Sequence, residues 1–452
     1  MAADQALSGS SPVNRNRLLR ILGITFGLAI AIGGTIGVGI LRIPGLVAAQ
    51  LGSAGLVMMV WILGGLYGFA GANTYAELGT MLPLAGGPYV YARRAYGDFG
   101  AFVVGWSDWL LRVSSMAYLA VALCDYSAAL FPISSGLTTP LAIVALILFT
   151  GLHYLGLRVG SRTQEIMSLF KVVVFLFIIV CAFLVRSDKQ VAQPVVSGFS
   201  SQPLLLFAAI ALALQNVIET YAGWNSPAYF AEESTQPDRN IPRSLFSGVL
   251  LVMGIYVLFN FAIVYALPFS KLAGSKLAAA DVAQQIFGGR STEIITVIAL
   301  VSVIGIFNAS FLMTPRVLYA LSRDGLFSPY GARVNAGGTP TGALLVTAAV
   351  AIILTTIGSF EKLFAFSGFL AVAVDAATFA ALFVLRKKEP GLSRPFKARG
   401  YPLLPAVVLG GAVVLLLAFV VSNTLNSVYA LVAIGLSYPV YLFTKARVTD
   451  AG

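Results

Sequence analysis

The chain has 452 residues, of which 58% are hydrophobic and 10% are charged, whereas about a quarter of an ordinary soluble domain is charged. This apolar content excludes a soluble globular fold. The formal net charge of +11 comes from basic residues in short loops between apolar stretches, so it does not indicate nucleic-acid binding. Cys124 and Cys181 both lie inside apolar stretches and predict neither a disulfide framework nor a thiolate metal site. No cofactor and no metal are expected.

Apolar stretches recur along the chain, and each is long enough to cross a hydrocarbon core of about 30 Å. They predict an all-α integral membrane protein that lies in the lipid bilayer with about twelve transmembrane helices. The predicted spans are 21–48, 54–81, 99–130, 138–157, 163–185, 204–231, 243–268, 290–322, 341–358, 361–386, 403–421 and 426–444. An even number of spans places both termini on one side of the membrane.

The basic residues predict which side that is. Six of them fall opposite the termini: Arg186, Lys189, Lys271, Lys276, Arg290 and Lys362. Twenty fall on the side of the termini: Arg15, Arg17, Arg20, Arg93, Arg94, Arg158, Arg162, Arg239, Arg243, Arg316, Arg323, Arg333, Arg386, Lys387, Lys388, Arg394, Lys397, Arg399, Lys445 and Arg447. By the positive-inside rule we expect a multi-pass protein of the plasma (cytoplasmic) membrane with cytoplasmic tails at 1–20 and 445–452.

Two predicted spans contain residues that interrupt a helix. The first span holds four closely spaced glycines: Gly33, Gly34, Gly37 and Gly39. We expect its backbone to leave helical geometry from Thr35 to Val38. Span 204–231 has a similar weakness at Gly223 and Pro227. Unpaired backbone groups at membrane depth are costly unless they line a cavity or meet a ligand, and such breaks in spans five apart are typical of inverted repeats around a transport site. Glycines that merely permit close helix packing are the alternative interpretation.

A broken helix offers both kinds of group that a zwitterionic amino acid needs. Amides at the start of its second half, here Val38, Gly39 and Ile40, point towards a carboxylate, and the free carbonyls that end its first half accept hydrogen bonds from an ammonium group. Backbone groups are therefore sufficient, and no ionised side chain is required.

Five strings, in order and spacing, resemble the motifs of the amino acid–polyamine–organocation (APC) superfamily of transporters. They are GGTIGVGIL at 33–41; YAELG at 75–79 followed by Pro83 and GGPYVY at 86–91; YAGWN at 221–225; Glu232 and Glu233 followed by Pro237, Arg239, Asn240 and Pro242; and RVLYALSRDG at 316–325. The resemblance covers about residues 20–445 and is strongest to bacterial relatives of the cationic and L-type amino acid transporters.

The resemblance implies a leucine-transporter-like fold of two inverted five-helix repeats, 21–185 and 204–386, with two additional helices at 403–444. It also implies that substrate binds between the first and sixth spans. There the amides of Val38 and Gly39 would hold the carboxylate, and the carbonyls of Thr35 and Ile36 would face the amine, with Gly37 between them. Span six would add Asn225 and carbonyls from Glu219, Thr220 and Ala222. Val38 stands where many relatives have serine, which removes a hydroxyl but keeps the amide.

Lys171 lies inside the predicted fifth span, seven residues after Gln164. A lysine at that depth costs about 2.5–3.5 kcal/mol on insertion scales, so we expect it to have a function. In relatives this ammonium resembles a substitute for a sodium ion that braces the first span, which predicts sodium-independent transport. Snorkelling towards an interface is the alternative interpretation.

Glu219 departs from the superfamily pattern, because relatives have a bulky aromatic residue there that closes the site. A carboxylate could attract a second amine or take up a proton, or it could pair structurally with a neighbour. Asn225, where some members for cationic substrates have a carboxylate, favours a neutral substrate. Asp108 and Arg112, four residues apart, predict an internal ion pair, and His153 is expected to be a satisfied core histidine. For Asp125 and Asp375 the sequence does not distinguish a structural role from a place on the substrate path.

The sequence therefore predicts a secondary amino acid permease that works by alternating access, sodium-independent, through exchange or proton coupling. The alternative within transport is a polyamine or cationic amino acid antiporter. A channel would need a continuous polar pore, and an intramembrane enzyme would need clustered catalytic groups, which the scarcity of His and Cys disfavours. The predicted partners are a small-molecule substrate, an amino acid or amine, and the lipid bilayer; the sequence does not indicate an oligomeric state.

Overall fold

The computed structural model describes residues 17–184, 203–275 and 277–449. These residues form helices joined by short connections and contain no named strand. The first group of helices is α1 (Ile24–Thr35), α2 (Gly39–Leu51), α3 (Ala54–Met81), α4 (Pro88–Ala128), α5 (Thr138–Tyr154), α6 (Leu157–Leu184) and α7 (Pro203–Tyr221), followed by the 3₁₀ helix η2 (Ser226–Glu233). The second is α8 (Pro237–Ala266), α9 (Phe269–Ala273), α10 (Ala278–Phe287), α11 (Ser291–Arg323), α12 (Thr341–Ile357), α13 (Phe360–Lys388), α14 (Leu403–Ser422), α15 (Thr424–Gly435) and α16 (Ser437–Thr449).

Each of the twelve predicted spans coincides with one helix or with two consecutive helices. In the described part of the chain, eight helical segments are long and apolar enough to cross a membrane, and the bent pair α1 and α2 makes nine. Two of the remaining predicted spans, α5 and α12, are apolar but have only 17 residues. The third, α4, includes charged residues such as Asp108 and Arg112. The predicted all-α membrane fold is therefore confirmed.

The boundaries differ from the prediction in three places. Helix α4 begins at Pro88, well before the predicted start at 99, and bends at Gly97, whose φ is +80°. Two short helices, α9 and α10, lie in the segment expected to be a loop. The twelfth span is divided at Leu436, and α16 continues to Thr449, past the predicted start of the C-terminal tail.

Several predicted features fall outside the described residues. These are most of the N-terminal tail, the last three residues of the C-terminal tail, and the basic residues Arg15, Arg186, Lys189 and Lys276.

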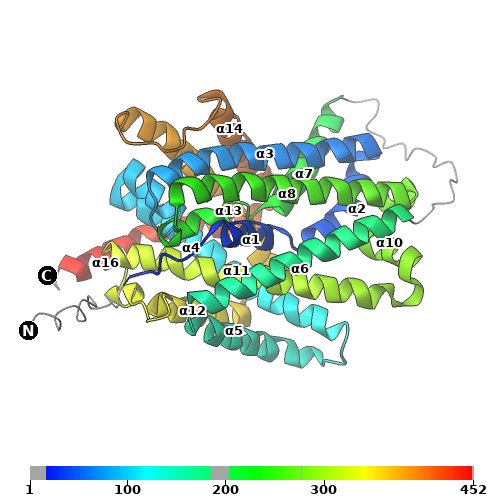
Figure 1. Cartoon of the computed structure of the whole chain (residues 1–452), viewed down its shortest axis with the longest axis horizontal. Helices are drawn as coiled ribbons and strands as arrows, with labels where there is room; N and C mark the ends of the chain where they lie inside the picture. Colours follow the sequence, from blue (N-terminus) through cyan, green and yellow to red (C-terminus); the bar gives the residue numbers. More distant parts are fainter. Residues whose placement is uncertain (1–16, 185–202, 276, 450–452) are drawn as a thin grey trace, which may run out of the picture.

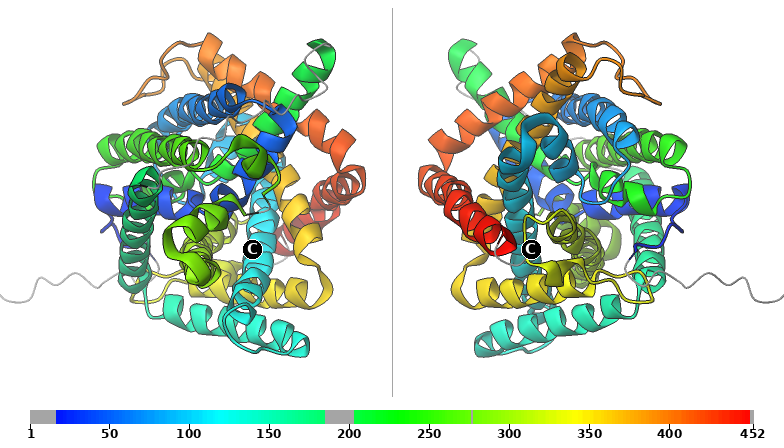
Figure 2. Two further views of the ribbon diagram at one scale, coloured as in Figure 1. Left: turned by 90° about the vertical axis from the view of Figure 1, so that its right-hand side faces the viewer. Right: turned by 90° about the vertical axis from the view of Figure 1, so that its left-hand side faces the viewer.

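The helices form a bundle with two distinct ends (Figure 1). Helix α1 begins and α16 ends towards the left of this view, and we call that end the terminus side. The junction of α2 with α3, and α10, lie towards the other end, which we call the opposite side. Helix α4 packs against α11 and α13, while α8 packs against α1, α3 and α6. Figure 2 shows the bundle from its two ends, along the long axis of Figure 1.

One short backbone pairing links two distant segments on the terminus side. The Leu22 N–H donates to the Glu233 carbonyl at 2.9 Å, and the Thr235 N–H donates to the Leu22 carbonyl at 2.9 Å. The segment before α1 is therefore fastened to the end of η2.

Candidate functional site

The first interruption lies between α1 and α2. Helix α1 ends at Thr35, α2 begins at Gly39, and the two axes are bent by 47°. Ile36 is extended, with ψ of 103°. Residues Ile36 to Val38 thus belong to neither helix, within the stretch from Thr35 to Val38 where the glycine pattern predicted the break.

The second interruption follows α7, which ends at Tyr221. Gly223 has a φ of +109°, a left-handed conformation that favours glycine. A Cβ at this position would lie 2.7 Å from the Gly34 carbonyl carbon, so the backbones of the two breaks are in direct contact. The Ser226 hydroxyl donates to the Gly223 carbonyl at 2.5 Å and fixes the start of η2.

Lys171 of α6 reaches the first break with its ammonium group. Its Nζ donates to the carbonyl of Gly33 at 3.0 Å and to that of Ile36 at 2.7 Å, and its side chain is only 2% exposed. Gly305 of α11 makes room for it, because a Cβ there would lie 2.5 Å from Lys171 Cε. The positive charge thus lies where carbonyls without helical partners end α1, which is the favourable end for a cation.

Tyr256 of α8 joins the two breaks from the other side. Its hydroxyl lies 3.1 Å from the Thr35 carbonyl and 3.2 Å from the Thr220 carbonyl. A hydroxyl has a single proton to donate, so the two carbonyls share it. This bridge holds the end of α1 beside the end of α7.

A cavity of about 200 Å³ lies beside the breaks and is lined by residues of α4, α7, α11, α13 and α14. Gly34 and Gly223 form part of its wall. Three residues predicted to contact substrate, Glu219, Ala222 and Asn225, also line it. The other predicted contacts lie outside this lining: Thr35, Ile36, Gly37, Val38, Gly39 and Thr220. Their direct contact with substrate stays a prediction.

Two hydrogen-bonded groups in the cavity contain carboxylates. Asp108 accepts from Arg112 at 3.0 Å and from the Tyr229 hydroxyl at 3.0 Å, and the Arg112 guanidinium lies 4.0 Å from the centre of the Tyr229 ring. The predicted pair between Asp108 and Arg112 is therefore confirmed. In the second group, Asp375 accepts from the Tyr75 hydroxyl at 2.5 Å.

Asn225 completes the second group, because its side-chain amide donates to Asp375 Oδ1 at 3.3 Å. This amide ties the second break to α13. The third carboxylate of the cavity, Glu219, has the neutral side chain of Gln215 as its hydrogen-bonding neighbour.

Comparison with known proteins identifies the family. Residues 21–441 match the family described as amino acid permease. The chain belongs to this family. The permease is 29% identical to the serine/threonine exchanger SteT of Bacillus subtilis (strain 168), over 96% of this chain and 98% of that protein. It is 28% identical to the mouse b(0,+)-type amino acid transporter 1, over 93% and 86% of the two chains. It is 29% identical to the human large neutral amino acids transporter small subunit 2, over 88% and 75%.

Family membership establishes the general function. The permease is a multi-pass membrane protein of the APC superfamily that transports amino acids, and it is a transporter, not an enzyme. Its substrates are small molecules, the amino acids, as the sequence predicted.

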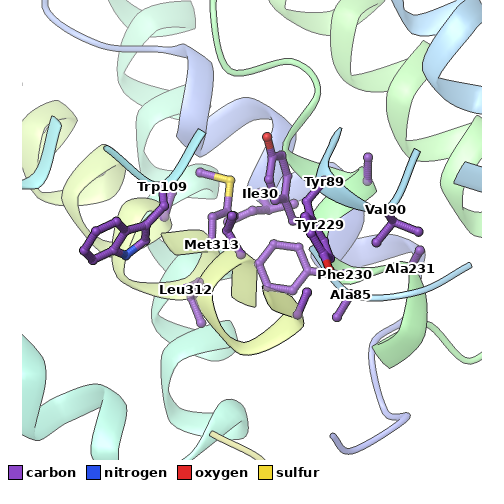
Figure 3. Packing of buried hydrophobic residues seen from close by; sticks show 14 of the residues in the cluster. Ile30, Ala85, Tyr89, Val90, Trp109, Tyr229, Phe230, Ala231, Leu312 and Met313 are labelled. Carbon is purple, nitrogen blue, oxygen red and sulfur yellow. The ribbon is translucent and has the colours of Figure 1, made fainter. Parts of the chain in front are cut away.

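On the terminus side of the cavity the permease is closed by packed side chains. The rings of Tyr229 and Phe230 of η2 lie beside Met313 of α11 and Ile30 of α1 (Figure 3). Below them Arg316 binds Glu233 through two contacts, of 2.5 and 2.7 Å, with side chains that are 3% and 0% exposed. The cavity therefore has no route to the terminus side through this layer.

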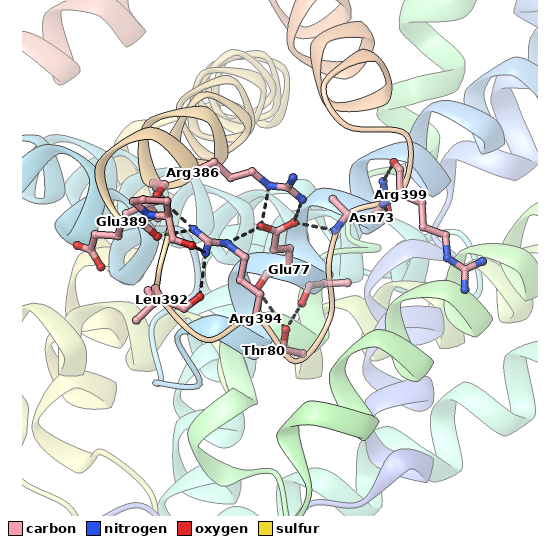
Figure 4. A network of polar contacts seen from close by, with 12 residues as sticks. Asn73, Glu77, Thr80, Arg386, Glu389, Leu392, Arg394 and Arg399 are labelled. Atoms are coloured by element: carbon pink, nitrogen blue, oxygen red, sulfur yellow. Dashed lines mark hydrogen bonds and ion pairs between the residues drawn. The ribbon is translucent and has the colours of Figure 1, made fainter.

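Further ion pairs surround this layer. Arg323 binds Glu232 at 2.9 Å, and Arg93 binds Asp324 at 2.7 Å. Glu77 of α3 accepts from Arg386 at 2.5 Å and Arg394 at 3.0 Å, while Asn73 binds the backbone of Arg399 (Figure 4). These contacts fasten the end of α13 and the segment after it to α3.

Sequence reasoning missed several residues of the permease that organise the site. Tyr256 gave no signal, because one tyrosine in an apolar span resembles any core residue. Tyr75 belongs to a recognised motif, but the motif does not reveal its partner Asp375, 300 residues away. His153 was interpreted correctly: its Nε2 lies 3.1 Å from Asn308 Oδ1 in the core.

Proposed function

We propose that this permease is a sodium-independent amino acid exchanger of the plasma membrane, with both termini in the cytoplasm. The observation that carries the proposal is the ammonium group of Lys171, which donates to the carbonyls of Gly33 and Ile36. A sodium ion bound at a helix break would use such carbonyl oxygens. Because Lys171 already supplies the positive charge, transport needs no metal ion at this place.

Exchange, as opposed to net uptake, is supported by the likeness to the serine/threonine exchanger over 96% of this chain. We further propose that 21–185 and 204–386 are the inverted repeats and that 403–444 are additional helices. In support, the breaks after α1 and α7 occupy corresponding places five spans apart and contact each other at Gly34 and Gly223. Alternating access would then be rocking of one group of helices around this junction.

The proposed orientation and membrane are supported by the basic residues of the described chain. Arg93, Arg158, Arg239 and Arg386 lie in segments that the alternation of predicted spans assigns to the terminus side, as do most other basic residues in the connections. Such an excess marks the cytoplasmic side. Binding of an antibody to an epitope tag after Lys445, before and after permeabilisation of cells, tests this orientation.

The test of sodium independence uses purified protein in liposomes loaded with unlabelled L-serine. We expect saturable uptake of labelled L-serine that changes less than twofold when sodium is replaced by choline at fixed pH and potential. A decrease of several-fold in choline would overturn the proposal.

Two lysine variants test whether Lys171 is responsible for sodium-independent exchange. Lys171→Met removes the charge but keeps a flexible side chain, and it should reduce exchange at least about tenfold, because two carbonyls lose their buried donor. Lys362→Met is the matched control, since Lys362 is exposed near the start of α13 and its loss should leave exchange unchanged.

A second measurement separates exchange from proton coupling. Exchange requires an internal amino acid, so empty liposomes should take up little labelled L-serine even with an imposed pH gradient. Strong uptake into empty liposomes, driven by that gradient, would contradict exchange and would indicate proton-coupled transport.

A further inference from the structure

Glu219 differs from the other carboxylates of the cavity in its surroundings. Asp108 is paired with Arg112, and Asp375 accepts from Tyr75 and Asn225. Among the ion pairs formed by the described residues, none includes Glu219. It nevertheless lines the cavity.

Glu219 lies beside α13 at a level nearer the start of this helix than Asp375. A Cβ on Gly368 of α13 would be 3.8 Å from Glu219 Oε1, which places this carboxylate beside Gly368. Asp375 is seven residues further along α13, about 10 Å at the rise of an α-helix. The cavity therefore has acidic side chains at two levels along α13. The break at Gly223 lies between Glu219, four residues earlier, and Asn225, which donates to Asp375.

Aromatic rings surround Glu219. The Cβ on Gly368 would also be 3.2 Å from Phe419 Cζ, so the Phe419 ring and the Glu219 carboxylate meet at the same face of α13. Tyr118 and Phe364 line the cavity too, and their rings are 5.4 Å apart, edge to face. A carboxylate among aromatic rings is an environment that attracts an organic cation, because the faces of the rings carry negative charge density.

We infer that Glu219, together with Tyr118, Phe364 and Phe419, forms a subsite for a positively charged side chain of the transported amino acid. The inference rests on the proposed function, since it assigns the substrate class of that same site. The α-amino and α-carboxyl groups lie at the breaks, and the side chain extends along α13 to its ammonium or guanidinium group at Glu219. Long cationic amino acids, such as lysine and arginine, fit the separation of the two levels.

The charged residues that line the cavity also favour a cationic side chain over an anionic or neutral one. Its lining contains three acidic residues, Asp108, Glu219 and Asp375, and one basic residue, Arg112. Because Arg112 is already engaged by Asp108, this basic residue of the cavity lining is not available to an anionic side chain. An uncharged side chain would leave the Glu219 carboxylate without a counter-ion, which is unfavourable when it replaces water.

The test compares ligands of similar shape that differ in charge. Exchange of labelled L-serine in proteoliposomes is inhibited with L-lysine or L-norleucine, and with L-arginine or L-citrulline. In each pair only the first carries a side-chain cation. We expect wild-type protein to be half-inhibited by the cationic member at a concentration at least about tenfold lower.

Three variants then identify the residue. In Glu219→Gln the preference for lysine over norleucine should fall to about one, while Glu219→Asp should retain part of it. Glu361→Gln removes the same charge from an exposed position near the start of α13 and should retain all of it. A single symmetric size-exclusion peak and a thermal unfolding midpoint close to that of wild type show that Glu219→Gln is folded.

The possible results separate the two proposals. If wild-type protein exchanges no L-serine or other amino acid, the proposed function fails. If it exchanges L-serine but does not prefer the cationic member of either pair, the inference about Glu219 is wrong and the proposed function stands. The same holds if Glu219→Gln keeps the preference. If Glu219→Gln does not fold, a reduced preference in Glu219→Asp with Glu361→Gln unaffected supports the subsite, and an unchanged preference in Glu219→Asp contradicts it.

Discussion

The two halves of the bundle are held together by different forces. On the terminus side, oppositely charged side chains from η2, α11, α4 and α13 form buried or half-buried pairs, and Arg316 with Glu233 is the most deeply buried of them. Around the cavity, Tyr118 of α4 packs edge to face against Phe360 and Phe364 of α13, and the ion pair of Asp108 with Arg112 lies within α4. Among the described residues, none of the ion pairs joins α7 to another helix.

This difference determines which half can open at lower cost. Separating a buried ion pair leaves two charges that must each be solvated or paired again. Separating aromatic rings loses only the free energy of their packing contact. In the conformation described here the ion pairs are intact, and packed side chains close the cavity towards the terminus side. Reversal of access requires the ion pairs to be broken together, and substrate bound in the cavity must supply part of that free energy.

The largest expected effect comes from breaking the deepest pair. Arg316→Ala leaves the Glu233 carboxylate, which is 0% exposed, without its cation. We expect the free energy of unfolding in detergent to decrease by about 3–5 kcal/mol, measured by chemical denaturation. The double variant Arg316→Met with Glu233→Met should recover more than half of this loss, because no unpaired charge stays buried. A loss below about 1 kcal/mol in Arg316→Ala would contradict the proposed difference between the halves.

An intermediate effect is expected at the junction of the breaks. Gly223→Ala forces a side chain into a residue with φ of +109° and against the Gly34 backbone. Such strain costs about 1–3 kcal/mol, and exchange of L-serine should fall at least about tenfold because the cavity wall is displaced. Gly254→Ala in α8 is the control: nothing lies within 4 Å of its new Cβ, so stability should be unchanged or slightly higher. Equal behaviour of the two variants would argue against the tight junction.

The smallest effect is expected from an exposed pair on the terminus side. Arg94 binds Glu389 at 2.8 Å, but its side chain is 52% exposed. Arg94→Ala should lower the free energy of unfolding by about 0.2–1 kcal/mol, and the difference should vanish in 1 M salt. Thermal unfolding at low and high salt measures this. If Arg94→Ala lowered the free energy of unfolding as much as Arg316→Ala, independently of salt, then burial would not explain the strength of the ion pairs on the terminus side.

Features that depend on local sequence were predictable. Apolar length located the helices that coincide with the predicted spans, and clustered glycines located the break at Ile36–Val38. The four-residue spacing of Asp108 and Arg112 predicted their pair because helix geometry alone brings such residues together. The two short helices α9 and α10 were missed, since neither is long enough to give a clear periodic pattern.

Features that depend on contacts between distant spans were not predictable. Lys171 was expected to brace the first span, but the identity of its acceptors, Gly33 and Ile36, depends on how α6 crosses α1. Glu77 lies in a recognised motif, yet its partners Arg386 and Arg394 are more than 300 residues away. Without information on which helices are neighbours, a charged side chain such as that of Glu77 has many equally acceptable partners in the sequence.

The backbone pairing at Leu22 has a mechanical consequence. Leu22 is bonded to Glu233 and Thr235 through the main chain, so no side-chain rearrangement can release it. The start of α1 and the end of η2 must therefore move together as one rigid unit. Arg316 of α11 holds this unit against α11 through its ion pair with Glu233. Any opening towards the terminus side has to swing both broken helices away from α11 together, which carries the movement directly to the glycine junction where the two backbones touch.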